Sequence, residues 1–140
     1  MSDPTEQIIS RVVSELAFLT PLKATGVPAP TDGQRAFKVQ FSGNCRGELV
    51  VLFSSGLAEV IAVNMCGVET VSELQLGEID EAACEVTNCM AGNLLPTLLG
   101  EHNEYSLAKP LAIAPPTERE KFSAIECTEG VIAVMIELEG

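Results

Sequence analysis

The chain has 140 residues, 46% of them hydrophobic and 20% charged, and its eight Lys+Arg against twenty Asp+Glu give a formal net charge of −12. This length and composition predict one folded domain, residues 1–140, and exclude a disordered chain. The negative charge repels phosphate backbones and anionic lipid headgroups, so neither nucleic acid nor a membrane surface is an expected partner.

The cysteine and histidine content limits which disulfide, metal and catalytic sites the chain can form. The five cysteines are an odd number without a Cys-x-x-Cys pair, which predicts reduced thiols in a cytoplasmic protein, most of them buried as small hydrophobic side chains. Because His102 is the single histidine, we expect no histidine metal site, no catalytic triad and no cofactor of the chain's own. A signal peptide is not expected, and no apolar run reaches the roughly 18 residues of a membrane helix.

Hydrophobic periodicity and turn residues predict the elements in chain order. Apolar residues spaced three and four positions apart indicate helices, and alternating or continuous apolar runs between turn residues indicate strands. Residues 27–33 and 72–77 are expected to be connectors. The expected elements are helix 3–19, strands 37–41 and 47–53, helix 57–65, helix 78–99, and strands 105–114, 121–127 and 131–138.

Individual residues are expected to set the ends of the helices. Ser54 or Ser55 can cap the second helix, and Gly67 is expected to end it. Pro96 lies within the pattern of the long helix and cannot donate a backbone hydrogen bond. We therefore expect Pro96 to kink or end that helix.

These elements predict an α/β (α+β) fold in which an antiparallel or mixed sheet is covered by helices. The long helix should pack on the sheet through one apolar face, formed by Ile79, Ala83, Val86, Met90 and Leu94. Two further leucines of this helix, Leu95 and Leu99, fall near its polar side and would be covered by a loop or belong to a partner surface. The run 131–136 fits either a sheet edge that pairs with a second copy or a buried central strand.

A narrow polar stripe lies opposite the apolar face of the long helix. Glu81, Glu85, Asn88 and Gly92 fall within it at about 100° per residue. A solvated helix face is the simplest interpretation. However, asparagine is a weak helix former, and an exposed helical glycine costs about 1 kcal/mol relative to alanine. A glycine here would let another backbone approach Asn88 closely.

The segments Glu85–Asn88 and Cys89–Asn93, with the later Pro115–Thr117, resemble the CheX/CheC/FliY family of chemotaxis phosphatases. The order and lengths of the expected elements also fit that family along nearly the whole chain. The family signature is an acidic or serine residue, then Glu-x-x-Asn on a helix, then a distant proline. Because the first helix has no asparagine three residues after Glu15, the single motif is similar to the CheX branch.

The residues that match this signature depart from it at two positions. Glu81 stands where the family usually has Asp or Ser. For the distant proline, Pro116 is favoured over Pro110 because it lies in a Pro-Thr context at a strand end.

The resemblance implies hydrolysis of the aspartyl phosphate on a CheY-like receiver domain, which would supply Mg²⁺ and a lysine. Asn88 would position the attacking water, since an amide both donates and accepts hydrogen bonds and phosphoryl transfer depends on alignment. Glu85 would pair with the receiver's lysine, Glu81 would make a rim contact, and Gly92 would give backbone clearance. The resemblance also implies a homodimer.

Two other classes of function remain open at this point. The same fold can serve as a non-enzymatic receiver-binding adaptor or dimerisation module, because fold does not determine function. A small-molecule binding domain would need a deep apolar pocket.

Overall fold

The computed structural model describes residues 4–100 and 104–139. Within them, three α-helices and a short 3₁₀ helix accompany seven strands. The helices are α1 (Pro4–Ala17), α2 (Leu57–Cys66), η1 (Val71–Glu73) and α3 (Glu78–Leu99). The strands are β1 (Pro21–Thr25), β2 (Arg35–Gly43), β3 (Gly47–Phe53), β4 (Tyr105–Leu107), β5 (Leu111–Ile113), β6 (Ser123–Cys127) and β7 (Gly130–Leu138).

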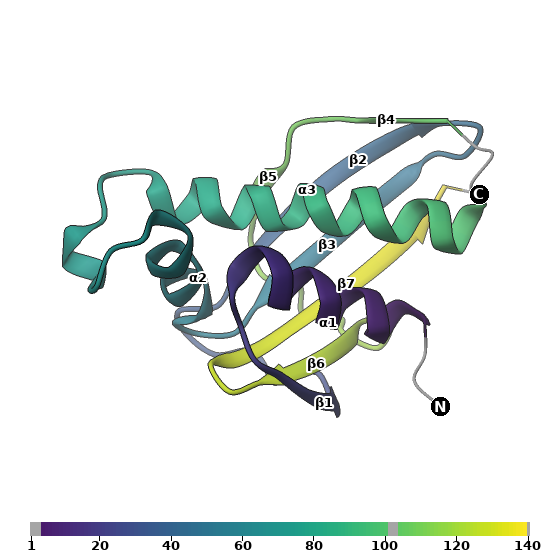
Figure 1. The fold of residues 1–140 in the computed structure, drawn as a ribbon. Helices are drawn as coiled ribbons and strands as arrows, with labels where there is room; N and C mark the ends of the chain where they lie inside the picture. Colours follow the sequence, from purple (N-terminus) through teal and green to yellow (C-terminus); the bar gives the residue numbers. More distant parts are fainter. Residues whose placement is uncertain (1–3, 101–103, 140) are drawn as a thin grey trace.

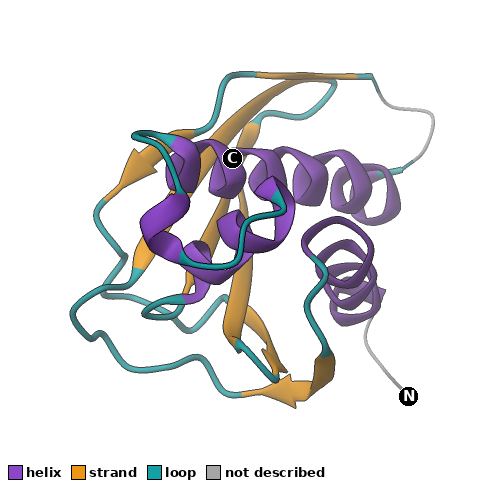
Figure 2. Ribbon diagram, turned by 60° about the vertical axis from the view of Figure 1, so that its left-hand side comes forward, coloured by secondary structure: helices purple, strands orange, loops and turns teal. Residues whose placement is uncertain are grey.

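All strand pairs are antiparallel, in the order β1-β6-β7-β3-β2-β4, with β5 also paired to β2. The helices lie in one layer over one face of this sheet (Figures 1 and 2). This arrangement confirms the predicted α+β fold. Strand β7 lies between β6 and β3, so the option that residues 131–136 form a sheet edge is wrong.

The expected long helix and the expected hairpin are confirmed. Helix α3 begins at Glu78 and ends at Leu99, and β2 pairs with β3 in a register that places Phe37 opposite Val51. Strand β1 was not predicted. It is short and starts at Pro21, and its central residues are exposed, so it shows no alternation of apolar and polar residues. An edge strand tolerates both features because only one of its sides is paired.

The expected strand 105–114 is divided into β4 and β5. Residues 108–110 separate them, and Pro110 has no N–H to donate to a ladder. The backbone N–H of Ala108 still donates to the carbonyl of Gln40 at 2.9 Å, so both pieces remain along β2. This connection therefore runs along the sheet edge beside α3.

The cap expected from Ser54 or Ser55 is wrong, because Gly56 precedes α2 in a left-handed conformation (φ 82) without a side-chain cap. The Ser54 hydroxyl instead accepts a hydrogen bond from the backbone N–H of Val131 at 2.9 Å. Gly67 ends α2 as predicted, with a positive φ of 70.

Pro96 does not end α3, which continues through it to Leu99, so that part of the expectation is wrong. The residues just before the proline explain this result. Leu94 and Leu95 are 0% and 1% exposed, and their burial stabilises the turn between Gly92 and Pro96 that lacks a backbone hydrogen bond. Leu95 is therefore part of the core and not of a partner surface, and Leu99 is half-buried against the core.

The core between helices and sheet includes the predicted face of α3. Ala83, Val86, Met90 and Leu94 are fully buried, and Ile79 is half-buried against them. They pack with β2, β3, β6 and β7 residues, and a smaller apolar cluster covers part of the other sheet face. Each fully buried aliphatic side chain contributes about 1.5–3 kcal/mol.

All five cysteines are free thiols, but the expectation that most are buried is wrong. Only Cys127 is buried, and burial raises the pKa of its thiol to about 11. Cys45, Cys84 and Cys89 are half-buried, and Cys66 is exposed. None of the described helices has the length and hydropathy needed to cross a membrane.

Candidate functional site

The polar stripe of α3 faces outward. Glu81, Glu85 and Gly92 are exposed and Asn88 is half-buried. Their spacing places them on one side of the helix, opposite the buried face that packs on β2 and β3. Glu85 and Asn88 therefore lie about one turn apart on the same surface.

Neither side chain of the Glu85–Asn88 pair is held strongly by its own chain. Within the described residues the Asn88 amide has no hydrogen-bond partner. Glu85 accepts only a long contact from the Cys89 thiol, with Sγ and Oε1 3.9 Å apart. Burial and the Glu85 charge both raise the pKa of the Cys89 thiol, so this thiol stays protonated near neutral pH. Both the amide and the carboxylate are thus available to a second molecule.

The surface around Gly92 is open. A Cβ atom built at Gly92 would meet nothing within 4 Å. Packing within the described part of the chain therefore does not require this glycine, and its position leaves room one turn beyond Asn88 for the backbone of another protein.

Polar contacts fix the start of α3 against neighbouring elements. Arg35 at the beginning of β2 binds Asp80 on α3 (Nη1–Oδ1 3.2 Å) and Glu59 on α2 (Nε–Oε1 2.9 Å). The thiol of Cys66 donates to Glu78 at 3.1 Å. Asp80 and Glu78 thus have partners, whereas Glu81 forms no ion pair within the described residues.

Helix α1 borders one side of the stripe. Arg11 Nη2 donates to Asn93 Oδ1 at 3.0 Å, and Asn93 Nδ2 donates to the carbonyl of Cys89 at 2.7 Å. Figure 1 shows the two helices beside each other. Arg11 is exposed and contributes a positive charge to this border, near the exposed carboxylate of Glu15.

The β4–β5 connection borders the other side. The thiol of Cys84, one residue before Glu85, lies 3.9 Å from the carbonyl oxygen of Pro110, and Pro110 is buried. The preference for Pro116 as the proline of this site is therefore wrong. Pro116 lines a hollow of about 580 Å³ together with Val50 and Met135, on the sheet face away from α3.

Sequence reasoning missed Arg11 and the 108–110 connection as neighbours of the stripe. The only available signal was Pro110 within an expected strand, which indicates a break but not which helix the break contacts.

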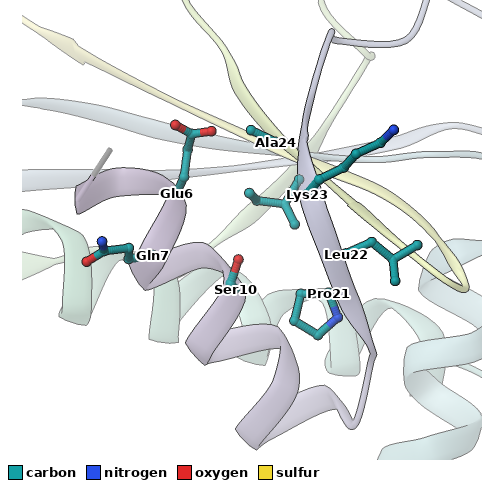
Figure 3. A pocket seen from close by; sticks show the side chains of 8 residues that line it. Glu6, Gln7, Ser10, Pro21, Leu22, Lys23 and Ala24 are labelled. Atoms are coloured by element: carbon teal, nitrogen blue, oxygen red, sulfur yellow. The ribbon is translucent and has the colours of Figure 1, made fainter. Parts of the chain in front are cut away.

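Another hollow, of about 360 Å³, lies between α1 and β1 and contains none of the stripe residues (Figure 3). Its lining is mixed polar and apolar, unlike the deep apolar pocket that a small-molecule domain needs. The residues that line it are Glu6, Gln7 and Ser10 from α1, Pro21, Leu22, Lys23 and Ala24 from β1, and Ile125.

Within residues 4–100 and 104–139, no group of three or more His, Cys, Asp or Glu side chains is arranged to hold a metal ion. His102 lies outside the described residues.

The fold is similar to several solved structures. The CheX protein of Desulfovibrio desulfuricans matches with a TM-score of 0.71 and 19% identity, over 97% of each chain. CheX of Vibrio vulnificus matches with a TM-score of 0.71 and 23% identity, over 97% of this chain and 94% of that one. The CheX-CheY-BeF3-Mg²⁺ complex of Borrelia burgdorferi matches with a TM-score of 0.69 and 17% identity, over 98% and 96% of the chains.

At these identities the structures establish the fold. Among curated proteins, no relative matches the sequence. The family assignment comes from the sequence itself, because a family model described as chemotaxis phosphatase CheX matches residues 36–139, which include the whole of α3. The chain therefore belongs to the CheX family of chemotaxis phosphatases.

Proposed function

We propose that this protein stimulates hydrolysis of the aspartyl phosphate on a CheY-like receiver domain, with Asn88 positioning the water and Glu85 docking on the receiver's lysine. The observation that carries the proposal is the outward-facing Glu85–Asn88 pair, one turn apart, on a chain of the CheX phosphatase family. The Borrelia burgdorferi CheX that shares this fold was solved in complex with CheY, BeF3 and Mg²⁺.

Hydrolysis of the aspartyl phosphate depends more on alignment of the attacking water than on a strong base. Hydrolysis of an acyl phosphate needs a water in line with the leaving oxygen and neutralisation of charge on the phosphoryl group. The carbonyl oxygen of an amide accepts a hydrogen bond from that water, and its NH₂ group donates one. Because the Asn88 amide is not engaged within the described part of this chain, it is free to hold the water by proximity. The Mg²⁺ that neutralises charge belongs to the receiver.

Glu85 supports the same geometry from one turn earlier. A carboxylate that pairs with a lysine inside a cleft forms a charge-assisted contact, which is stronger than an exposed ion pair. This contact would fix how far α3 enters the receiver and so where Asn88 comes to lie. Glu81 would contact the rim of the receiver, and the open surface at Gly92 would accept its backbone.

Replacing Glu85 with alanine should raise the receiver concentration that gives half-maximal stimulation by about tenfold to a hundredfold, since a hydrogen bond to a charged group contributes about 1.5–3 kcal/mol. Phosphate loss from a phosphorylated receiver, followed across a receiver titration, measures this shift. Glu118→Ala is the matched control, because Glu118 is exposed beside the hollow on the far sheet face. An unchanged half-maximal concentration would contradict the role of Glu85.

If the unmodified chain binds the receiver without accelerating phosphate loss, the adaptor function holds instead.

We also propose the domain to which this site belongs and the compartment in which the protein acts. Residues 1–140 would form one domain, because α1 and β1 lie outside the matched residues 36–139 but pack on α3 and pair with β6. The protein would act in the cytoplasm, which its five free thiols support.

We also propose a homodimer. Strand β1 supports it, because within the described residues β1 pairs only with β6, and Leu22 on it is 58% exposed. Light scattering after size exclusion should give twice the chain mass of 14.8 kDa. Leu22→Pro should lower that mass towards the monomer if the edge of β1 forms the contact. A monomeric unmodified chain would overturn the dimer.

A further inference from the structure

The β4–β5 connection carries a lysine at the edge of the polar stripe. Pro110 is buried with its carbonyl 3.9 Å from the Cys84 thiol, and the Ala108 N–H donates to the Gln40 carbonyl at 2.9 Å. Lys109 therefore stands between two anchored residues. Its own side chain is exposed. Because Cys84 lies one turn before Asn88, the connection borders the stripe on the side of Asn88.

The positive charge of Lys109 acts on a side chain of α3. Burial and the charges of Asp80 and Glu81 raise the pKa of the Cys84 thiol, whereas the positive charge of Lys109 lowers it. The ammonium group is thus close enough to influence the helix at the level of the stripe. This electrostatic effect agrees with the position given by the Cys84–Pro110 contact.

Lys109 has no ion pair within the described residues, although the chain has twenty acidic residues and only eight basic ones. In residues 4–100 and 104–139, the basic side chains that form ion pairs are those of Arg35, Lys38 and Lys121. Across the stripe, Arg11 places a second exposed cation on α1. The outward surface of α3 therefore has an exposed cation on each side, with the carboxylates of Glu81 and Glu85 between them and that of Glu15 near Arg11.

This pattern bears on how such an acidic protein approaches its partner. An aspartyl phosphate is anionic, and the oxygen ligands that Mg²⁺ prefers are carboxylates as well as phosphate oxygens. A stripe of glutamates alone would be repelled by that surface. Cations at its borders lower this repulsion locally and speed encounter, because charge complementarity acts chiefly on association.

We propose that Lys109 is a specificity-determining residue that binds an anionic group on the receiver beside the phosphorylation site, with Arg11 in the same role on the opposite border. This inference rests on the proposed function and extends it to residues outside the Glu-x-x-Asn motif. The partner it selects is a receiver that carries acidic side chains on both sides of its lysine-containing cleft.

The test is a charge reversal with a matched control. Lys109→Glu and Lys121→Glu change the net charge equally, but Lys121 is exposed beside the hollow on the sheet face away from α3. At low salt, Lys109→Glu should weaken association with the receiver roughly tenfold, and the difference should shrink at high salt because rim charges act through screened electrostatics. The maximal rate at saturating receiver should stay unchanged, and Arg11→Glu should behave in the same way.

The readouts separate this inference from the proposed function. Association is measured by fluorescence with a receiver carrying Mg²⁺ and BeF3, which reports docking without hydrolysis, and phosphate loss is measured in parallel. If the unmodified chain docks but does not accelerate phosphate loss, the proposed hydrolysis is wrong. The docking measurement still decides the role of Lys109 in that case. If Lys109→Glu docks as well as Lys121→Glu at low salt, the inference is overturned.

Discussion

Replacing Asn88 with alanine should lower stimulated dephosphorylation by about a hundredfold or more, since a misplaced reacting group costs on that order in rate. The side chain lies on the outward surface of α3, next to Glu85, and has no hydrogen-bond partner within the described residues. Alanine removes both the donor and the acceptor that would hold the water. The rate of phosphate loss from a saturating receiver measures the effect.

The same substitution should leave the fold intact. Removing an unpartnered amide from a helix surface changes the free energy of unfolding by no more than about 0.5 kcal/mol, and alanine is the better helix former. Thr97→Ala serves as the control for a polar-to-alanine change at an exposed position of α3. If phosphate loss is as fast with Asn88→Ala as with the unmodified protein, the role given to Asn88 is wrong.

Replacing Leu94 with alanine should lower the free energy of unfolding by about 2–5 kcal/mol, because it leaves a cavity in a packed interior. Leu94 is 0% exposed and packs in the main core under α3. Leu98→Ala is the matched control on the same helix, since Leu98 is 43% exposed. Urea unfolding measures both losses, and equal losses would contradict the assignment of faces on α3.

That measurement also tests whether residues 1–140 form one domain. Unfolding should follow a single transition with the same midpoint by different probes, as expected for one cooperative unit of this size. Two separate transitions, one of which is unchanged by Leu94→Ala, would show that α1 and β1 unfold apart from the rest.

The long helix and its two faces were predictable because they depend on local spacing. A pattern that repeats over 22 residues fixes which side chains share a face, whatever the rest of the chain does. Glu85 and Asn88 therefore appear on one side in both the sequence and the structure. The hairpin of β2 and β3 was predictable for a similar reason, since both strands are adjacent in sequence and rich in buried apolar residues.

The borders of the stripe were not predictable, because they depend on contacts between distant segments. Cys84 and Pro110 are 26 residues apart, and Arg11 and Asn93 are 82 apart. No local pattern encodes which connection passes beside a helix. Strand β1 escaped prediction for another reason. Most of its stability comes from pairing with β6 and not from its own side chains, which are largely exposed.

The burial of α3 along the face opposite the stripe has a mechanical consequence. The carboxylate of Glu85 and the amide of Asn88 project from one helix whose opposite face, from Ala83 to Leu94, is buried in the core. The spacing of the two backbone positions from which these side chains project is therefore fixed by the core, and only the side-chain torsions remain free to adjust. In the proposed complex, the receiver would therefore have to adapt its cleft to a helix surface of fixed shape.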